Sequence, residues 1–260
     1  MENKRPLLLI SNDDGYDAKG IRQLVEMLSD FGDIIVCAPE SARSGFSCAF
    51  SATEPLRLCM REKREGLEVW SCNGTPVDCV KMALAEIVPR KPDMVIGGIN
   101  HGDNASVNVH YSGTMGVTIE GCMKYISSVA FSLCDHRPDA DFEPLRPLVR
   151  QITERILREP LPLGVCLNVN FPIIPSNHVT SYKGVKVCRM AKGTWGGEVE
   201  KCHHPRGYDY WWMVGYYTND EPDAEDTDNW ALAHGYVAIT PTRVDVTAYE
   251  TIDLIKSWNL

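Results

Sequence analysis

The sequence predicts an α/β protein in three layers, with helices on both faces of a doubly wound sheet and a C-terminal extension of hairpin and helix. Three observations support this prediction. Short runs of apolar and β-branched residues recur along the chain, segments with helical periodicity separate them, and the composition changes after about residue 190. The alternation favours parallel strands, because a parallel pair needs a long crossover that a helix usually supplies.

The first βαβ unit lies near the N-terminus. Residues 7–11 and 34–38 form the two apolar strands, and Phe31-Gly32 ends the helix between them. The apolar residues of this helix fall at i, i+3, i+4 and i+7, the spacing of one helix face. They are Ile21, Leu24, Val25 and Leu28. A unit of this kind at the start of the chain indicates a Rossmann-like sheet.

The remaining elements continue the alternation. Further strands are predicted over residues 94–96, 129–133, 165–172 and 235–240, and further helices over 76–88, 113–124, 143–158 and about 248–258. We expect one domain over residues 1–260, with a core of about 1–190 and an extension of 191–260.

The extension is rich in aromatic residues. Alternation over residues 208–217 suggests a hairpin or an arm. Trp211, Trp212, Tyr216 and Tyr217 together carry more apolar surface than a lone arm can expose. Core packing and a subunit interface would both account for them, and the sequence leaves the two open.

Composition excludes several classes of protein. The 260 residues carry a net charge of −9, which argues against binding to duplex nucleic acid, where basic contacts to phosphate dominate. No apolar run approaches the roughly 18 residues of a transmembrane helix, and the run over residues 7–10 is shorter than a secretory signal requires. We therefore expect a cytoplasmic protein without membrane contact. The ten cysteines include no CxxC pair, and most are expected to be buried free thiols.

An acidic pair follows the first strand, in the segment SNDDG. Asp13 and Asp14 come directly after it, and ligands of open α/β sheets bind outside the carboxyl ends of the strands. Two adjacent carboxylates repel each other, and they suit a hard divalent cation that neutralises both. One aspartate could instead cap the following helix while the other is solvated. The pair alone leaves both interpretations open.

Two further loops lie at strand ends. The segment after residue 38 is rich in serine, and Ser44 could offer a hydroxyl to a metal ion. The segment GGINHGDNASVNVHYSGTMG places Asn100 at a strand end, Asn104 in a turn, and Ser112-Gly113-Thr114 at the start of a helix. Small hydroxyl residues at a helix start make good N-caps, and they leave backbone N–H groups that bind phosphate.

Five segments together resemble the SurE family, the survival-protein nucleotidases. They are LLISNDDGYDAKGI, VCAPESARSGFS, NGTPVDCV, GINHGDNASVNVHYSGTMGV and GYVAITPTRVDVTAY, in this order over about residues 7–250. The resemblance implies a metal-dependent phosphatase that removes phosphate from nucleoside 5′-monophosphates, and often from 3′-monophosphates. It also implies a homodimer or homotetramer built through the C-terminal extension.

The resemblance further implies the site residues. One divalent metal ion per subunit, Mg²⁺ or Mn²⁺, would be held by Asp13, Asp14, Ser44 and Asn100. Phosphate would be contacted by Asn12, Asn104, Ser112, Gly113 and Thr114. Two features depart from the family pattern, namely His101 and Asp103 after the GIN segment and the long insertion around residues 195–228.

The mechanism expected from these residues is hydrolysis of a phosphomonoester by water. Direct attack by water is favoured because no Cys, Ser or His is obviously placed as a covalent nucleophile, and Asp13 or Asp14 would accept the proton of that water. An exopolyphosphatase that acts on short polyphosphate is one alternative. A non-catalytic nucleotide-binding protein that uses the same pocket is the other.

Overall fold

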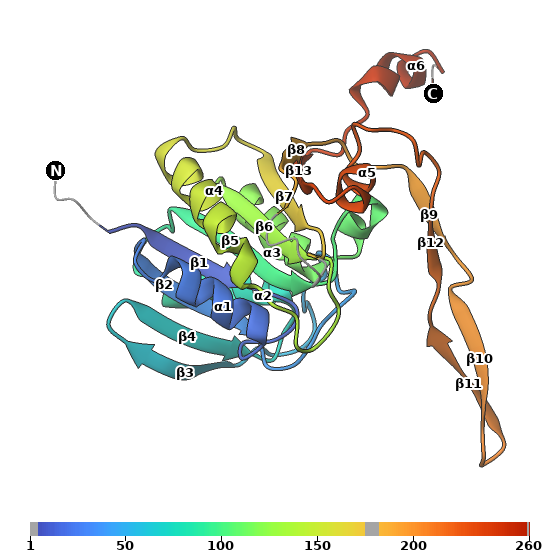
Figure 1. Cartoon of the computed structure of the whole chain (residues 1–260). Coiled ribbons are helices and arrows are strands. Elements are labelled where there is room, and N and C mark those ends of the chain that lie inside the picture. The colour runs from blue at the N-terminus through green and yellow to red at the C-terminus, as the bar shows by residue number, and fades with distance from the viewer. Residues whose placement is uncertain (1–4, 175–181, 259) are drawn as a thin grey trace.

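The computed structural model describes residues 5–174, 182–258 and 260, and a nine-stranded sheet forms its centre (Figure 1). In sheet order the strands are β3 (Leu58–Arg64), β4 (Leu67–Cys72), β2 (Asp33–Pro39), β1 (Leu7–Ser11), β5 (Met94–His101), β6 (Ser128–Leu133), β7 (Val165–Phe171), β13 (Val237–Arg243) and β8 (Val185–Val187). The strands from β4 to β7 run parallel, whereas β3 and β13 are antiparallel to their neighbours β4 and β7. The predicted α/β sheet is confirmed.

Helices cover both faces of this sheet. The helices on these faces are α1 (Lys19–Leu28), α2 (Pro76–Met82), α3 (Gly113–Met123), α4 (Arg146–Arg158) and α5 (Asp228–Ala233), whereas the last helix, α6 (Ile252–Lys256), lies away from the sheet (Figure 1). Leu8 of β1 packs in a cluster with the apolar side chains of α1 and α4. Leu9, the next residue, packs with those of α2 and α3 on the opposite face. Successive side chains of a strand point to opposite faces, so β1 divides the core into two layers.

Most predicted elements lie where the sequence placed them, with differences at their ends. The helix predicted over residues 76–88 is α2 followed by a π-helical turn, η1 (Ala83–Ile87). The helix predicted over 143–158 begins as a 3₁₀ turn, η3 (Glu143–Leu145), and continues as α4. Strands β3 and β4 do not follow from the sequence pattern. Strand β3 is a charged, mostly exposed edge strand without an apolar run, and β4 has Glu68 and Ser71 among its apolar residues.

The C-terminal extension contains a two-part arm. Strand β9 (Gly193–Gly196) pairs antiparallel with β12 (Tyr216–Asn219), and β10 (Val199–His204) pairs antiparallel with β11 (Tyr208–Met213). This arm and α6 lie apart from the helices that cover the sheet (Figure 1). Trp211 and Trp212 are 57% and 61% exposed, so core packing, one of the two interpretations of the arm aromatics, is wrong for them. The other interpretation, a subunit interface, stays a prediction.

Two smaller expectations concern thiols and membranes. All ten cysteines are free, and six of them are buried, as expected for small apolar side chains. Of the helices in the described part of the chain, none has both the length and the apolar character needed to cross a bilayer.

Candidate active site at the carboxyl edge of the sheet

The carboxyl ends of β1, β2 and β5 bring the three predicted loops together. The backbone N–H of Arg43, after β2, donates to the carbonyl oxygen of Asp13 at 2.7 Å. The backbone N–H of His101, at the end of β5, donates to Oδ2 of Asp14 at 3.4 Å. These neighbouring parallel strands end at one edge of the sheet, so loops far apart in the sequence converge there.

Asn12 shapes the acidic loop. Its Nδ2 donates to the carbonyl oxygen of Gly15 at 3.0 Å, and its Oδ1 accepts from the N–H of Gly15 at 3.1 Å. Both polar groups of this buried side chain are therefore used inside the loop. This turn directs the two carboxylates that follow Asn12, while its predicted contact with phosphate stays a prediction.

Asp13 lies against the N-terminus of α3. The Thr114 hydroxyl donates to Oδ1 of Asp13 at 2.5 Å, and the carboxylate is only 4% exposed. A Cβ added at Gly113 would lie 2.7 Å from Cβ of Asp13, so only glycine leaves room for this contact. The helix therefore begins with its positive dipole end beside an acidic side chain.

Burial raises the pKa of Asp13 to about 6; the Thr114 hydroxyl opposes this rise, and the charge of Asp14 adds to it. Burial also raises the pKa of Asp14, although the His101 N–H and the charge of His136 oppose the rise. Within the described residues, no lysine or arginine is among the groups that shift either pKa. Two neighbouring carboxylates without such a partner form a site that a divalent cation would neutralise.

Asn100 adds an oxygen to the acidic pair. Its Nδ2 donates to the carbonyl oxygen of Gly102 at 2.8 Å, which turns Oδ1 toward the Thr114 hydroxyl, 3.5 Å away. Ser44 is exposed in the loop that Arg43 ties to Asp13. Carboxylate, amide and hydroxyl oxygens suit a hard cation such as Mg²⁺ or Mn²⁺.

No group of three His, Cys, Asp or Glu residues that could hold a metal ion occurs in the part of the chain that the structure describes. A cation at this edge would therefore depend on the amide and hydroxyl oxygens as well as on the two carboxylates. The capping alternative for the acidic pair is wrong for α1, because its N-cap is Ala18 and no side chain caps it.

The start of α3 carries the predicted phosphate-binding residues. Ser112 is the N-cap, and its Oγ accepts from the N–H of Met115 at 2.9 Å. Thr114 is bonded to Asp13, as described above. The predicted segment Ser112–Thr114 and the acidic pair therefore meet in one place, and the N-terminal N–H groups of a helix are suited to bind an anion.

Asn104 is fixed by a buried amide network. Its N–H donates to Oδ1 of Asn170 at 2.7 Å, and its Nδ2 donates to Oγ of Ser132 at 2.6 Å. Its carbonyl oxygen accepts from Nδ2 of Asn168 at 2.7 Å. The sequence analysis missed Asn168, Asn170 and Ser132. The available signal was two amides spaced by two residues in an otherwise apolar strand, which places both on one face.

Comparisons with known proteins identify the family of this chain. The family model described as "Survival protein SurE" matches residues 8–197. Proteins named "5'-nucleotidase SurE" from Phocaeicola vulgatus and Bacteroides fragilis are 55% and 52% identical to this chain. Both alignments cover 100% of this chain, and they cover 99% and 100% of the two relatives.

A solved structure gives the same result for the fold. The crystal structure of the SurE protein from Aquifex aeolicus matches with a TM-score of 0.81 and 34% sequence identity. The match covers 98% of this chain and 100% of that chain, so the likeness includes the arm as well as the sheet.

Proposed function

This chain belongs to the SurE family, and on that basis we propose that it is a metal-dependent 5′-nucleotidase. It would hydrolyse nucleoside 5′-monophosphates, and also 3′-monophosphates, to nucleoside and phosphate. The whole-length relatives named as 5′-nucleotidases support the reaction class. The observation that carries the site is the buried carboxylate of Asp13, held by Thr114 at the start of α3 beside Asp14.

The oxygen ligands proposed for one divalent cation are the side chains of Asp13, Asp14, Ser44 and Asn100. When bound, a Mg²⁺ or Mn²⁺ ion would supply positive charge that polarises the phosphoryl group. The fit rests on the chemistry of the donors, since within the described residues no lysine or arginine shifts the pKa of either carboxylate, and the amide of Asn100 turns its oxygen toward Thr114.

The residues of the chain itself would bind the phosphate and move the proton. The N–H groups at the start of α3 and the side chain of Asn104 would hold the phosphoryl oxygens and stabilise their charge. Asp13 or Asp14 would accept the proton of the attacking water, with no covalent intermediate. Asn12 would contribute mainly by holding the acidic loop in shape, since both of its polar groups bond to Gly15.

The exposed apolar side chains of the arm support a homodimer or homotetramer. Trp211, Trp212 and Met213 follow one another on β11, so Trp212 points to the opposite face of the ribbon from Trp211 and Met213, and each is more than half exposed. Exposed apolar surface of this extent usually marks an interface. The assembly would cover it with a second copy of the chain.

Phosphate release tests the proposal directly. Wild type and Asp13→Asn would be incubated with nucleoside 5′- and 3′-monophosphates and with tripolyphosphate, in Mg²⁺, in Mn²⁺ and in EDTA. We expect release from nucleotides that requires metal and is lost in Asp13→Asn. The matched control is Asp17→Asn, in the same loop, whose carboxylate is exposed and faces Arg22 at 3.9 Å.

The alternatives give different results in the same assay. Faster release from tripolyphosphate than from any nucleotide would favour the exopolyphosphatase. Nucleotide binding without phosphate release would favour the non-catalytic protein. An Asp13→Asn variant with full activity would rule out the proposed site.

A further inference from the structure

The base of the arm holds a turn of the core that lies beside the phosphate site. This turn, η2 (Ser106–His110), is a 3₁₀ helix between Asn104 and the N-cap Ser112. The N–H of Ser112 donates to the carbonyl oxygen of Asn108 at 3.0 Å, which fixes the turn to the start of α3. Any shift of η2 therefore changes the distance between the two segments that the proposed function assigns to phosphate.

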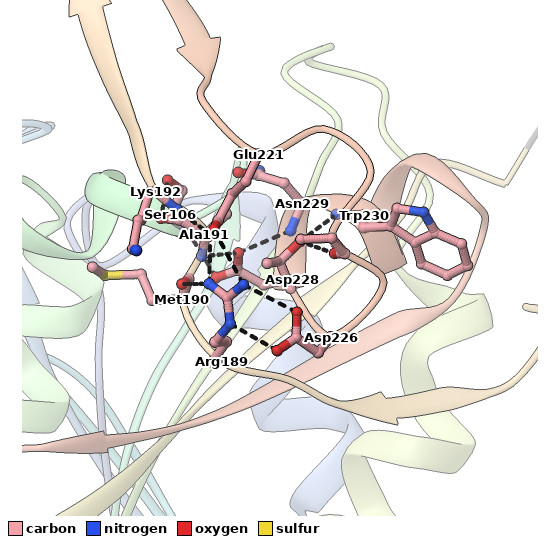
Figure 2. Close-up of polar contacts among 12 residues, drawn as sticks. Ser106, Arg189, Met190, Ala191, Lys192, Glu221, Asp226, Asp228, Asn229 and Trp230 are labelled. Atoms are coloured by element: carbon pink, nitrogen blue, oxygen red, sulfur yellow. Dashed lines mark hydrogen bonds and ion pairs between the residues drawn. The ribbon is translucent and has the colours of Figure 1, made fainter.

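Asp228 makes the central contact from the arm side. Its Oδ2 accepts from the N–H of Ser106 at 2.9 Å (Figure 2). Its Oδ1 accepts from the N–H groups of Ala191 and Asn229, at 2.9 and 2.8 Å. One fully buried carboxylate thus joins the core turn, the segment that leads into the arm and the start of α5. Burial raises the pKa of Asp228, and the three N–H donors oppose that rise.

Ser106 adds two hydrogen bonds of its own. Its Oγ donates to the carbonyl oxygen of Ala191 at 2.9 Å and forms a 2.6 Å hydrogen bond with the hydroxyl of Tyr217 on β12. Ser106 also has a φ of +52°, in the left-handed region. A side chain there costs roughly 1–2 kcal/mol, so these contacts with the arm offset strain in the turn.

The far end of the turn is held in the same way. Nε1 of Trp195 on β9 donates to Oδ1 of Asn108 at 2.9 Å. The two paired strands β9 and β12 therefore both contact η2, β12 through Tyr217 and β9 through Trp195. We call these contacts of Asp228, Tyr217 and Trp195 with Ser106 and Asn108 the clasp.

We propose that Asp228 is a positioning residue for phosphate binding, acting through the clasp on Asn104 and the start of α3. This inference rests on the proposed function. The amide network of β6 and β7 fixes Asn104 from the core side, whereas the clasp fixes the following turn from the arm side. The arm would then serve the site as well as subunit assembly.

The first test replaces Asp228 with asparagine. An amide has one acceptor oxygen, so it cannot accept from Ser106 on one side and from Ala191 and Asn229 on the other. In the metal-loaded enzyme we expect KM for a nucleoside 5′-monophosphate, and the inhibition constant of inorganic phosphate, to rise by about tenfold. The rise in KM should exceed the fall in kcat, because the groups that accept the proton stay in place.

The matched control is Asp226→Asn. Asp226 lies two residues away and pairs with the side chain of Arg189 at 2.8 and 3.1 Å, with no contact to the turn (Figure 2). We expect its KM and phosphate inhibition to match wild type. An equal change in Asp226→Asn would overturn the inference, because it would indicate a general disturbance of the arm.

A milder variant covers the case in which Asp228→Asn does not fold. Tyr217→Phe removes only the hydroxyl that reaches Ser106 and Asn229. We expect a KM increase of about threefold and faster hydrogen exchange at the amides of residues 104–108. Unchanged KM, phosphate inhibition and exchange in this variant would overturn the inference.

Different results would refute the proposed function and the proposed role of Asp228. A wild-type enzyme that releases no phosphate from any nucleotide would refute the proposed function. An active wild type whose Asp228→Asn variant folds, and keeps the wild-type KM and phosphate inhibition, would refute the clasp alone.

Discussion

The central sheet and the arm differ in how far they expose large aromatic side chains to solvent. At the sheet, Phe131 and Phe171 are fully buried between β-strands and helices of the same chain. On the arm, Trp211 and Trp212 are more than half exposed. The sheet needs no further cover, because α1 to α4 lie on its two faces. In the described structure the distal ribbon of β10 and β11 has no such layer, and the proposed assembly would cover its apolar surface with a second copy of the chain.

Deleting a core side chain should have the largest effect. We expect Phe131→Ala to lower the free energy of unfolding by about 3–5 kcal/mol, since it removes a buried ring and leaves a cavity. Urea denaturation followed by circular dichroism measures this. Val246→Ala, in the C-terminal extension, is the control, because Val246 is 92% exposed and should change stability by less than about 0.5 kcal/mol. Similar losses in both variants would contradict the comparison.

Two glycine-to-alanine substitutions compare how much activity a new side chain removes at the site and on the arm. In Gly113→Ala the new Cβ would collide with Cβ of Asp13, so we expect kcat/KM to fall by about 100-fold, the effect of a displacement of roughly 1 Å. Gly207→Ala, in the turn of the distal ribbon, has φ +87° and no atom within 4 Å of the new Cβ. It should cost about 1 kcal/mol of local stability and leave kcat/KM unchanged. Normal activity in Gly113→Ala would refute the contact as functionally important.

Loss of the hydrogen bond from Thr114 to Asp13 should reduce activity less than the displacement of Asp13 by Gly113→Ala. Thr114→Val keeps the shape of the side chain but removes the donor to Oδ1 of Asp13. We expect kcat to fall by about tenfold, with weaker activation by Mg²⁺, because the carboxylate loses its fixed orientation. Thr114→Ser retains the hydroxyl and should stay within about twofold of wild type. Equal activity of the valine and serine variants would argue that orientation is set elsewhere.

The arm variants should change stability least. Replacing both Trp211 and Trp212 with serine removes apolar surface that this chain leaves exposed. We expect the far-UV circular dichroism of the chain to be unchanged and its mass in light scattering to fall to that of a smaller assembly. Tyr125→Ser, at an exposed aromatic residue of the core, is the control and should leave the mass unaltered. A double variant with the wild-type mass would show that the tryptophans do not hold the assembly.

The sequence predicted most central strands well because they are short apolar runs bounded by turn residues. Strand β5 is the exception: only residues 94–96 were predicted, because two glycines follow them although the strand continues to His101. Residues 7–11 match β1 at both ends, and 129–133 miss only the first residue of β6. Edge strands have a weaker apolar pattern in their sequence. Strand β3 keeps its polar side chains in water and needs no apolar pattern, so its sequence does not distinguish it from a loop.

Part of the site also followed from residue type and position. Asp13, Asn100 and Thr114 come at strand ends or at a helix start, and the structure brings both Asp13 and Asn100 within hydrogen-bonding distance of the Thr114 hydroxyl. Asp228 and Asn170 could not be found in this way. Each acts through backbone groups more than 60 residues away in the sequence, and only the folded chain defines those partners.

The sequence by itself determined the order of strands and helices and the residue types at the strand ends, because these depend on local periodicity and on the known direction of a parallel sheet. The tertiary structure alone decided that Asn12 braces its own loop, that Asp13 faces α3, and that the arm contacts the turn beside Asn104. These features are pairings between distant segments. They depend on how the layers pack, and no local pattern encodes that.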